Sequence, residues 1–421
     1  MQPFADLGAI IEDRWSDSNY DESVFPRLAE EALTEANLTD HVDPWEIIRW
    51  VHSTPNLPEQ MDVDARFGNP PITVFVGSRF YIDAYYWLDG TTTIHQHSFS
   101  GAFQVLWGGS VHSKYIFKQE REINPHFLIG KIQLSDVSLL ERGDIRQINP
   151  GRDFIHSLFH LERPSITITV RTHKAPAAGP QYSYFKPSIA INPFFENPSL
   201  SKKRQTVSLL LDMKHPQVDS FIADLIDSSD FHTSYSLLKK AFDVLCHRQL
   251  EELFGGSRSY ERFQALLDRA RRKHGQLADL LLPVFEEEWR QAEIARRRAE
   301  IKHEDHRFFL ALLMNVPDRM TILKLVKQRF PDIDEVELII DWISELSRTK
   351  IFGSKEPNVL GLSEFGESHL LAFRGLLEGR STEEIKSHAA AATSRPGREL
   401  QAIEKSLDQI QSQTLLRPIF A

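Results

Sequence analysis

Three histidines are the residues of this chain best suited to chemistry. His95 and His97 are separated by one residue in a run that reads as a β-strand, so both imidazoles share one face of it and can bind a single divalent ion without rearranging the backbone. A chelate needs a third ligand, and His156 follows a turn at Pro150 and Gly151. An antiparallel barrel would bring the start of that strand back beside the first one. The spacing therefore predicts a three-histidine metal site.

Strand parity alone does not select the third ligand. His160 lies four residues beyond His156, and an even offset along a strand keeps the same face. Both histidines therefore stay candidates on these grounds. The competing interpretation is that these side chains form hydrogen bonds in a barrel that holds no metal. His112 and His173 are expected at the surface or around the site, not among the ligands.

The segment from 61 to 200 has the pattern of a small antiparallel β-barrel. Many short alternating runs are separated by turns, as in barrels and jelly rolls. In the run that ends at Arg171, isoleucine and valine alternate with Thr167, Thr169 and Arg171 itself. If the apolar set packs outward, the second set lines the interior. The run 111–117, which follows a Gly-Gly turn, is expected to form a hairpin with the strand before it.

The rest of the chain has helical periodicity, so the expected fold class is α+β. Residues 1–60 are interpreted as a helical lead-in packed on the barrel. Two all-α regions are expected after the barrel, at 201–305 and 306–385. The second of them, three helices before a short wing-like stretch, is compatible with a winged-helix fold. Residues 386–421 are expected to be a tail, with a flexible connection before a final short helix.

Composition and charge narrow the class of protein. The 421 residues carry a net charge of −10 with a sequence pI near 6.0, which argues against binding nucleic acid through bulk charge. Basic runs at 269–273 and 296–298 are interleaved with glutamates and indicate solvated helix faces. A single cysteine, Cys246, suits a reducing cytoplasm. No signal peptide or membrane-spanning run is recognisable, so the expected location is the cytoplasm.

The two histidine segments together resemble the two sequence motifs of the cupin superfamily, over residues about 65 to 190. Ile94-His95-Gln96-His97 stands where the first motif has its His-x-His pair. In most cupins a glutamate follows that pair, but here the nearest polar residue is Gln104. This departure resembles the three-histidine group, which includes cysteine dioxygenase and related thiol dioxygenases. The Pro-Gly turn before His156 makes it, and not His160, the equivalent of the last ligand of the family.

The resemblance implies a cofactor and a reaction. The cofactor would be Fe(II), with another divalent metal as the alternative, and the reaction would be the dioxygenation of a small anionic thiol to a sulfinate. Three neutral imidazoles leave the ion its full charge, which suits a thiolate ligand, and the lack of a carboxylate points away from the 2-oxoglutarate type of oxygenase. The alternatives are oxidation of a larger substrate and a non-enzymatic metal or metabolite sensor, whose helical region would bind a protein partner.

The resemblance also implies which residues hold the substrate. In the family an arginine upstream of the His-x-His strand binds the substrate carboxylate; Arg66 is the candidate here and Arg79 the alternative. The thioether cross-link of the family needs a cysteine where this chain has Ala102. The catalytic tyrosine of the family corresponds to a position near Thr169 or Arg171, which argues against cysteine itself as the substrate. Arg171 is instead expected to bind an anionic group in the catalytic site.

Overall fold

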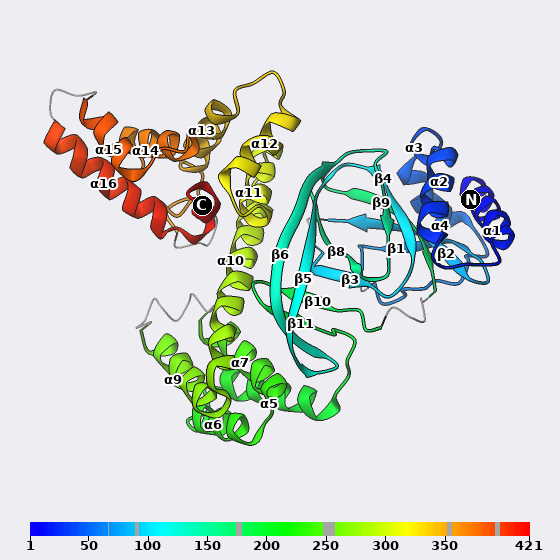
Figure 1. Cartoon of the computed structure of the whole chain (residues 1–421), viewed down its shortest axis with the longest axis horizontal. Coiled ribbons are helices and arrows are strands. Elements are labelled where there is room, and N and C mark those ends of the chain that lie inside the picture. The colour runs from blue at the N-terminus through cyan, green and yellow to red at the C-terminus, as the bar shows by residue number, and fades with distance from the viewer. Residues whose placement is uncertain (66, 89–91, 174–178, 247–256, 352–355, 392–395) are drawn as a thin grey trace.

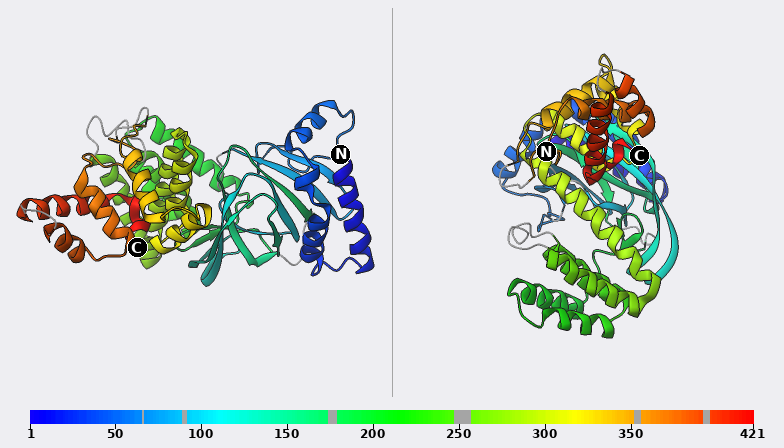
Figure 2. Two further views of the ribbon diagram at one scale, coloured as in Figure 1. Left: turned by 90° about the horizontal axis from the view of Figure 1, so that it is seen from above. Right: turned by 90° about the vertical axis from the view of Figure 1, so that its left-hand side faces the viewer.

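A β-rich body lies between a small group of N-terminal helices and a larger helical region, and these two helical parts occupy opposite ends of the molecule (Figure 1 and Figure 2). The predicted fold class, an α+β chain with a small antiparallel β-barrel, a helical lead-in and a helical C-terminal region, is confirmed. The computed structural model describes all residues except 66, 89–91, 174–178, 247–256, 352–355 and 392–395.

The N-terminal helices cover the outer face of one sheet. Their bounds are α1 (Gln2–Asp17), α2 (Phe25–Ala36), α3 (Leu38–His41) and α4 (Pro44–Ser53). Helix α4 begins as expected, because Pro44 suits the first turn and the Asp43 side chain accepts a hydrogen bond from the Trp45 backbone N–H. Apolar side chains of α1, α2 and α4 pack against the sheet in one core, which fixes that face of the sheet as structural.

The covered sheet is antiparallel, with strand order β1-β2-β9-β4-β7. Alternation sorts its side chains: Ile166, Ile168 and Val170 of β9 are buried against the N-terminal helices, so Thr167, Thr169 and Arg171 face the other way. The predicted orientation of this run is therefore confirmed. The strands are β1 (Pro71–Val76), β2 (Phe80–Trp87), β4 (Gly101–Trp107), β7 (Ile145–Ile148) and β9 (Ser165–Thr172).

The remaining strands form a closed antiparallel ring in the order β10-β11-β6-β5-β8-β3. The hairpin predicted between the 111–117 run and the strand before it is wrong, because β5 pairs with β6 and β8. Both edges of β4 are taken by β7 and β9, and the turn at Gly108, with φ at +73°, leads into the other sheet. The strands are β3 (Ile94–His97), β5 (Ser110–Asn124), β6 (Phe127–Leu140), β8 (Gly151–His160), β10 (Ser183–Phe185) and β11 (Ile189–Ile191).

Helix α10 joins two groups of helices beside the barrel (Figure 1). The described residues after β11 contain no strand, and the wing-like part of the winged-helix prediction falls partly on 352–355, outside the described residues, so that part stays a prediction. The first group is α5 (Pro198–Asp212), α6 (Val218–Ser228), α7 (Phe231–Leu245), α9 (Ser257–His274), η1 (Gly275–Leu280) and α10 (Leu281–Glu300). The second is α11 (Glu304–Asn315), α12 (Arg319–Arg329), α13 (Glu335–Leu346), α14 (Glu367–Leu377), α15 (Thr382–Ala391), α16 (Pro396–Ser412) and η2 (Thr414–Ile419).

The segment expected to be a tail is largely part of the second helical group. Helix α16 has 17 residues, and Ile403, Leu407 and Ile410 are buried in the same core as α14. Their spacing of three and four residues places them on one helix face. This face, and not a short terminal helix, holds the C-terminal residues against the rest of the chain.

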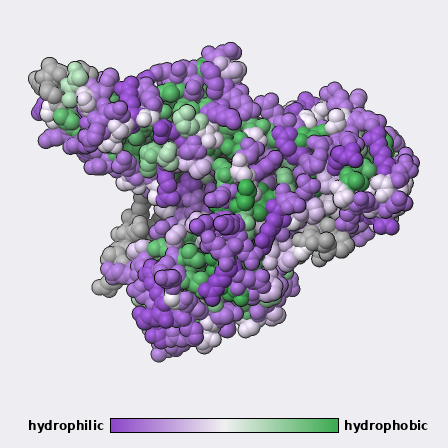
Figure 3. Space-filling model, in the orientation of Figure 1, coloured by the Kyte–Doolittle hydropathy of each residue, from purple (hydrophilic) through white to green (hydrophobic). Residues whose placement is uncertain are grey.

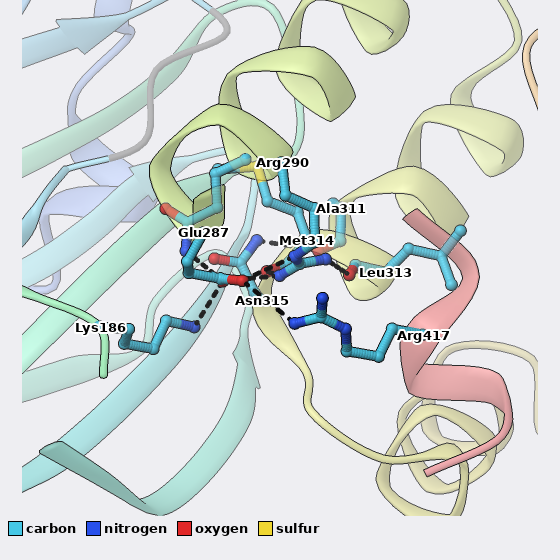
Figure 4. A network of polar contacts seen from close by, with 9 residues as sticks. Lys186, Glu287, Arg290, Ala311, Leu313, Met314, Asn315 and Arg417 are labelled. Atoms are coloured by element: carbon cyan, nitrogen blue, oxygen red, sulfur yellow. Dashed lines mark hydrogen bonds and ion pairs between the residues drawn. The ribbon is translucent and has the colours of Figure 1, made fainter. Parts of the chain in front are cut away.

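Where α10 meets the barrel and α11, buried arginines hold the parts together; we call this contact the α10 junction. Arg290 donates to both carboxylate oxygens of Glu287 at 2.8 Å and to two backbone carbonyls of α11 (Figure 4). Arg298 donates to carbonyls at the end of β8 and in α11, and its guanidinium lies 4.7 Å from the Phe159 ring. These hydrogen bonds satisfy two cations that are 6% and 1% exposed.

The outer surface is mostly hydrophilic on the face shown in Figure 3, with hydrophobic residues in smaller separate areas. None of the described helices has the length and apolar character that a membrane span requires.

Candidate metal centre

Strand register brings the three predicted ligands together. Alternation on β3 places His95 and His97 on one face, and β8 pairs with β3 so that His95 lies opposite His156. One ligand atom from each ring lies within 4.8 Å of the others. His160, two alternations further along β8, lies elsewhere: its ring stacks on Trp87 at 4.6 Å and its Nδ1 contacts the Ser110 hydroxyl at 3.1 Å. The geometry therefore favours His156 as the third ligand.

Hydrogen bonds orient two of the rings. The Nδ1 of His95 lies 2.7 Å from the Thr93 carbonyl oxygen; because a carbonyl can only accept, Nδ1 carries the proton and Nε2 keeps its lone pair. The Nδ1 of His156 lies 3.1 Å from the Nε2 of His112. Such outer partners fix the tautomer and orientation of metal-binding histidines. Both contacts leave the Nε2 atoms free to face the cavity.

The ring nitrogens fit a divalent cation. The Nε2 atoms of His97 and His156 are 2.9 Å apart, and two nitrogens that bind one ion at right angles, each about 2.1 Å from it, lie about 3 Å apart. Two unprotonated nitrogens at this separation repel unless a proton or a cation lies between them. The Nδ1 of His97 is buried without a partner. A bound metal would explain why the Nε2 lone pairs of His97 and His156 converge.

Burial keeps the imidazoles in the form that metals bind. The rings of His95, His97 and His156 belong to residues that are 8%, 8% and 2% exposed. Burial, with the charges of His95 and Arg171, holds the pKa of His97 well below its usual value near 6.5. Burial and the neighbouring histidines do the same to the pKa of His156. The neutral imidazole is the ligand form, so the site needs no deprotonation near neutral pH.

The triad opens into a cavity of about 710 Å³ between the two sheets. One wall carries the histidines of β3 and β8, and the opposite wall consists of inward-facing residues of β2, β4 and β9. The lining combines aromatic side chains with polar and charged ones, including Asp83, Thr167 and Thr169. Such a combination of aromatic surface with convergent polar groups is typical of small-molecule sites.

Arg171 lines this cavity, as its strand parity predicted. Its guanidinium carbon lies 3.5 Å from the centre of the Phe99 ring and 5.1 Å from that of Tyr81. Its Nε is buried without a hydrogen-bond partner, and the Asp83 carboxylate in the same wall interacts with it electrostatically without a direct ion pair. A cation held on ring faces without a direct ion pair is suited to bind an anion.

Neither of the other two candidate substrate-binding arginines, Arg66 and Arg79, is placed in the cavity by the described residues. Arg66 lies outside the described residues. Arg79 is exposed on the far side of the sheet, where its guanidinium stacks 4.2 Å from the Tyr20 ring, and it does not line the cavity. Five arginines of the two basic runs form contacts within the chain: Arg269 with Asp227, Arg271 with Asp268 and Asp279, Arg296 with Glu293, and Arg297 and Arg298 with backbone carbonyls.

Sequence reasoning missed a buried acid in the cavity wall. Asp83 is 2% exposed and accepts hydrogen bonds from the Thr73 hydroxyl at 2.8 Å and the Tyr85 hydroxyl at 2.7 Å. Burial raises its pKa, although the two hydroxyl donors and Arg171 lower it. The signal was present in the sequence, because alternation along β2 places Tyr81, Asp83 and Tyr85 on one face opposite an apolar set.

His112 lies beside the triad, the second of the two positions expected for it. It is fully buried on β5, and burial lowers its pKa to about 3. Its approach to His156 depends on the register of β5 against β8, in which Lys114 lies opposite His156. No local pattern contains that register, since the paired residues of the two strands are 40 to 50 positions apart.

The chain matches no protein-family model and no curated protein. Several solved structures are similar in part. TT1209 from Thermus thermophilus is 18% identical over 28% of this chain and 97% of its own, with a TM-score of 0.19. An uncharacterized conserved protein with a double-stranded β-helix domain from Klebsiella pneumoniae is 18% identical over 31% and 97%, with a TM-score of 0.20. The DMSP lyase DddQ from Ruegeria pomeroyi is 12% identical over 42% and 94%, with a TM-score of 0.20.

Proposed function

We propose that this chain is a mononuclear non-heme Fe(II) cupin oxygenase that converts a thiol to a sulfinate. The observation that carries the proposal is the meeting, in one cavity, of three neutral histidines and an arginine whose buried Nε has no hydrogen-bond partner. The histidines fit a divalent cation that keeps its full charge. The positively charged arginine binds an anionic group of the substrate, so the substrate is held at two points.

The reaction needs no further reductant. A thiol and one dioxygen molecule give a sulfinic acid, RSH + O2 → RSO2H, in which the electrons lost by sulfur are those gained by dioxygen. When bound at the triad, a ferrous ion would supply the site for the thiolate and for dioxygen.

The residues of the chain position the substrate and keep water out. Arg171, set on Phe99 next to His97, holds an anionic group close to the metal position. Phe103 and Leu158 present apolar surface to the same space. Restricting the substrate in this way lowers the entropic part of the barrier, and a dry site protects reactive species from hydrolysis.

A second candidate function is favoured by the size of the cavity. About 710 Å³ lies within the range of roughly 300–1,000 Å³ that is usual for drug-sized ligands, so the space exceeds what a small thiol requires. Metal-dependent oxidation of a larger substrate therefore fits the same residues.

Oxygen uptake tests both candidates. Protein purified without oxygen, loaded with Fe(II) and given a panel of small and larger anionic thiols should consume one dioxygen for each thiol lost, and mass spectrometry should find both oxygen atoms in the product. If the protein holds iron but none of the thiols supports oxygen consumption, the thiol dioxygenase proposal is overturned. The larger substrate would then have to be sought among other anions, or the chain would be a metal-dependent sensor.

A further inference from the structure

The metal ligand His97 and the anion-binding Arg171 lie close together at one end of the cavity. The Phe99 ring contacts the His97 ring, with 4.6 Å between centroids, and supports the Arg171 guanidinium at 3.5 Å. A single phenyl ring therefore separates the anion-binding group from a metal ligand. A ligand that reaches both has its metal-binding atom and its anionic group only a few bonds apart, which leaves most of the cavity for the rest of the ligand.

Aromatic side chains form part of the walls beyond the metal ligand and the anion-binding arginine, beside the polar Asp83, Thr167 and Thr169. Tyr81 and Tyr85 of β2 and Phe103 of β4 line the space, each at most 7% exposed. The Arg171 guanidinium lies 5.1 Å from the Tyr81 ring centre, and the Tyr85 hydroxyl donates to Asp83. Because that hydroxyl already has an acceptor, the Tyr85 ring offers mainly apolar surface to a ligand.

The mouth of the cavity is bordered by exposed hydrophobic side chains. Val63, Phe67 and Phe194 line the cavity and are 82%, 40% and 45% exposed; we call these three residues the collar. Val63 and Phe67 precede β1 and Phe194 follows β11, so segments from distant parts of the chain meet here. Exposed apolar residues gathered at one opening mark a binding surface more often than scattered ones do.

We propose that the substrate is an anionic thiol with an apolar tail, a 2-mercapto acid that carries an alkyl or aryl chain. The carboxylate binds Arg171, the sulfur is directed to the triad, and the tail runs along the aromatic walls to the collar. This inference rests on the proposed function for the identity of the metal-binding group. It goes beyond the proposed function because it assigns the remaining cavity volume and the collar to the apolar tail of the substrate.

Binding to the zinc-loaded full-length chain tests the tail separately from turnover, because zinc has no redox chemistry. The probes are mercaptoacetate, 2-mercaptohexanoate and 2-mercaptooctanoate, measured by isothermal titration. Affinity should rise about fourfold for each methylene group that enters the cavity. Equal affinity for all three acids, or tighter binding of mercaptoacetate, would overturn the proposal.

Variants locate the tail. Phe194→Ser should reduce the increase in affinity with chain length and leave the affinity for mercaptoacetate unchanged. Arg171→Leu should weaken the binding of all three acids by the same factor. Phe221→Ser on α6, which removes a phenylalanine of similar exposure (38%) outside the cavity lining, should change neither. A loss at Phe221→Ser equal to that at Phe194→Ser would show that the collar is not the tail site.

The iron-loaded chain distinguishes the two proposals. Length-dependent binding without oxygen uptake would refute thiol dioxygenation and leave the ligand class standing. Oxygen uptake with mercaptoacetate that does not improve with chain length would support thiol dioxygenation and refute the tail.

Discussion

Two arginines that rest on phenylalanine rings show how the cavity differs from the α10 junction. Arg298 lies 4.7 Å from Phe159 and donates to backbone carbonyls of β8 and α11. Arg171 lies 3.5 Å from Phe99, and its buried Nε has no hydrogen-bond partner. Buried polar groups are nearly always hydrogen-bonded in folded chains. Arg298 follows this rule and holds the barrel against α11, whereas the Nε of Arg171 departs from it where a ligand would supply the missing partner. The Nε of Arg297 on α10 also lacks a hydrogen bond, but the same guanidinium donates to the Val359 carbonyl.

The same contrast separates two histidines of one strand. His156 and His160 both lie on β8 and are 2% and 0% exposed. His160 is enclosed by Trp87 and Ser110, while His156 faces another ring nitrogen at 2.9 Å. Burial alone therefore does not mark a functional histidine; the kind of atom that its nitrogen faces does.

The largest expected effect is the loss of metal from the triad. Replacing His95, His97 or His156 singly by Ala removes one of three nitrogen ligands, so stoichiometric metal should no longer be retained after gel filtration, as measured by elemental analysis. His160→Gln, an equally buried change on the same strand, should retain metal. Full metal content in all three alanine variants would disprove the ligand assignment, and loss only at His160 would move the site.

A change in the junction should affect stability and not the metal. Arg290→Met removes the bidentate partner of Glu287, whose side chain is 13% exposed, while Lys186 at 3.7 Å and Gln291 at 3.0 Å remain. The change also deprives two buried carbonyls of α11 of their donor, so we expect a loss of about 1–3 kcal/mol, the cost of leaving buried polar groups unsatisfied. Urea unfolding of the variant measures that loss. Arg296→Met is the matched control on the same helix, because its pair with Glu293 is more exposed and should contribute less than about 1 kcal/mol. Similar unfolding midpoints for the two variants would contradict this contrast.

Arg171→Leu should have the opposite profile. Arg171 interacts with Asp83 electrostatically but not through a direct ion pair, so the free energy of unfolding should change little, and metal content should stay the same. Binding of an anionic ligand should weaken by about 1.5–3 kcal/mol, the value of a hydrogen bond to a charged group, or roughly 10- to 150-fold. Arg79→Leu, outside the cavity, serves as control. Unchanged ligand affinity in Arg171→Leu would remove this arginine from the site.

The smallest of these effects concerns His112, which we expect to position His156 through the 3.1 Å contact between their nitrogens. His112→Ala should weaken metal binding about 10- to 100-fold, as is usual for the loss of a group that orients a ligand, and His112→Gln, which keeps an acceptor, should lose less. Competition with a chelator measures the affinities. Equal losses in both variants would indicate a packing role and not an orienting hydrogen bond.

Local periodicity was sufficient for the parts of the site that lie on single strands. The shared face of His95 and His97, and that of Thr167, Thr169 and Arg171, follow from the two-residue repeat of a strand. The helical lead-in and the helical C-terminal region follow from apolar spacing in the same way. These features depend on neighbours only a few residues away, so a linear sequence contains them.

Register and pairing between distant strands were decided only by the tertiary structure. The facing of His95 and His156, the exclusion of His160 and the approach of His112 all depend on how β8 pairs with β3 and β5, and the failed hairpin shows that β5 could not be assigned a partner locally. The lack of a hydrogen-bond partner for the Nε of Arg171 is likewise a property of the whole cavity. Sequence determines which side chains share a strand face, but only the packed sheets determine which faces meet, because pairing energy is shared among segments that lie far apart along the chain.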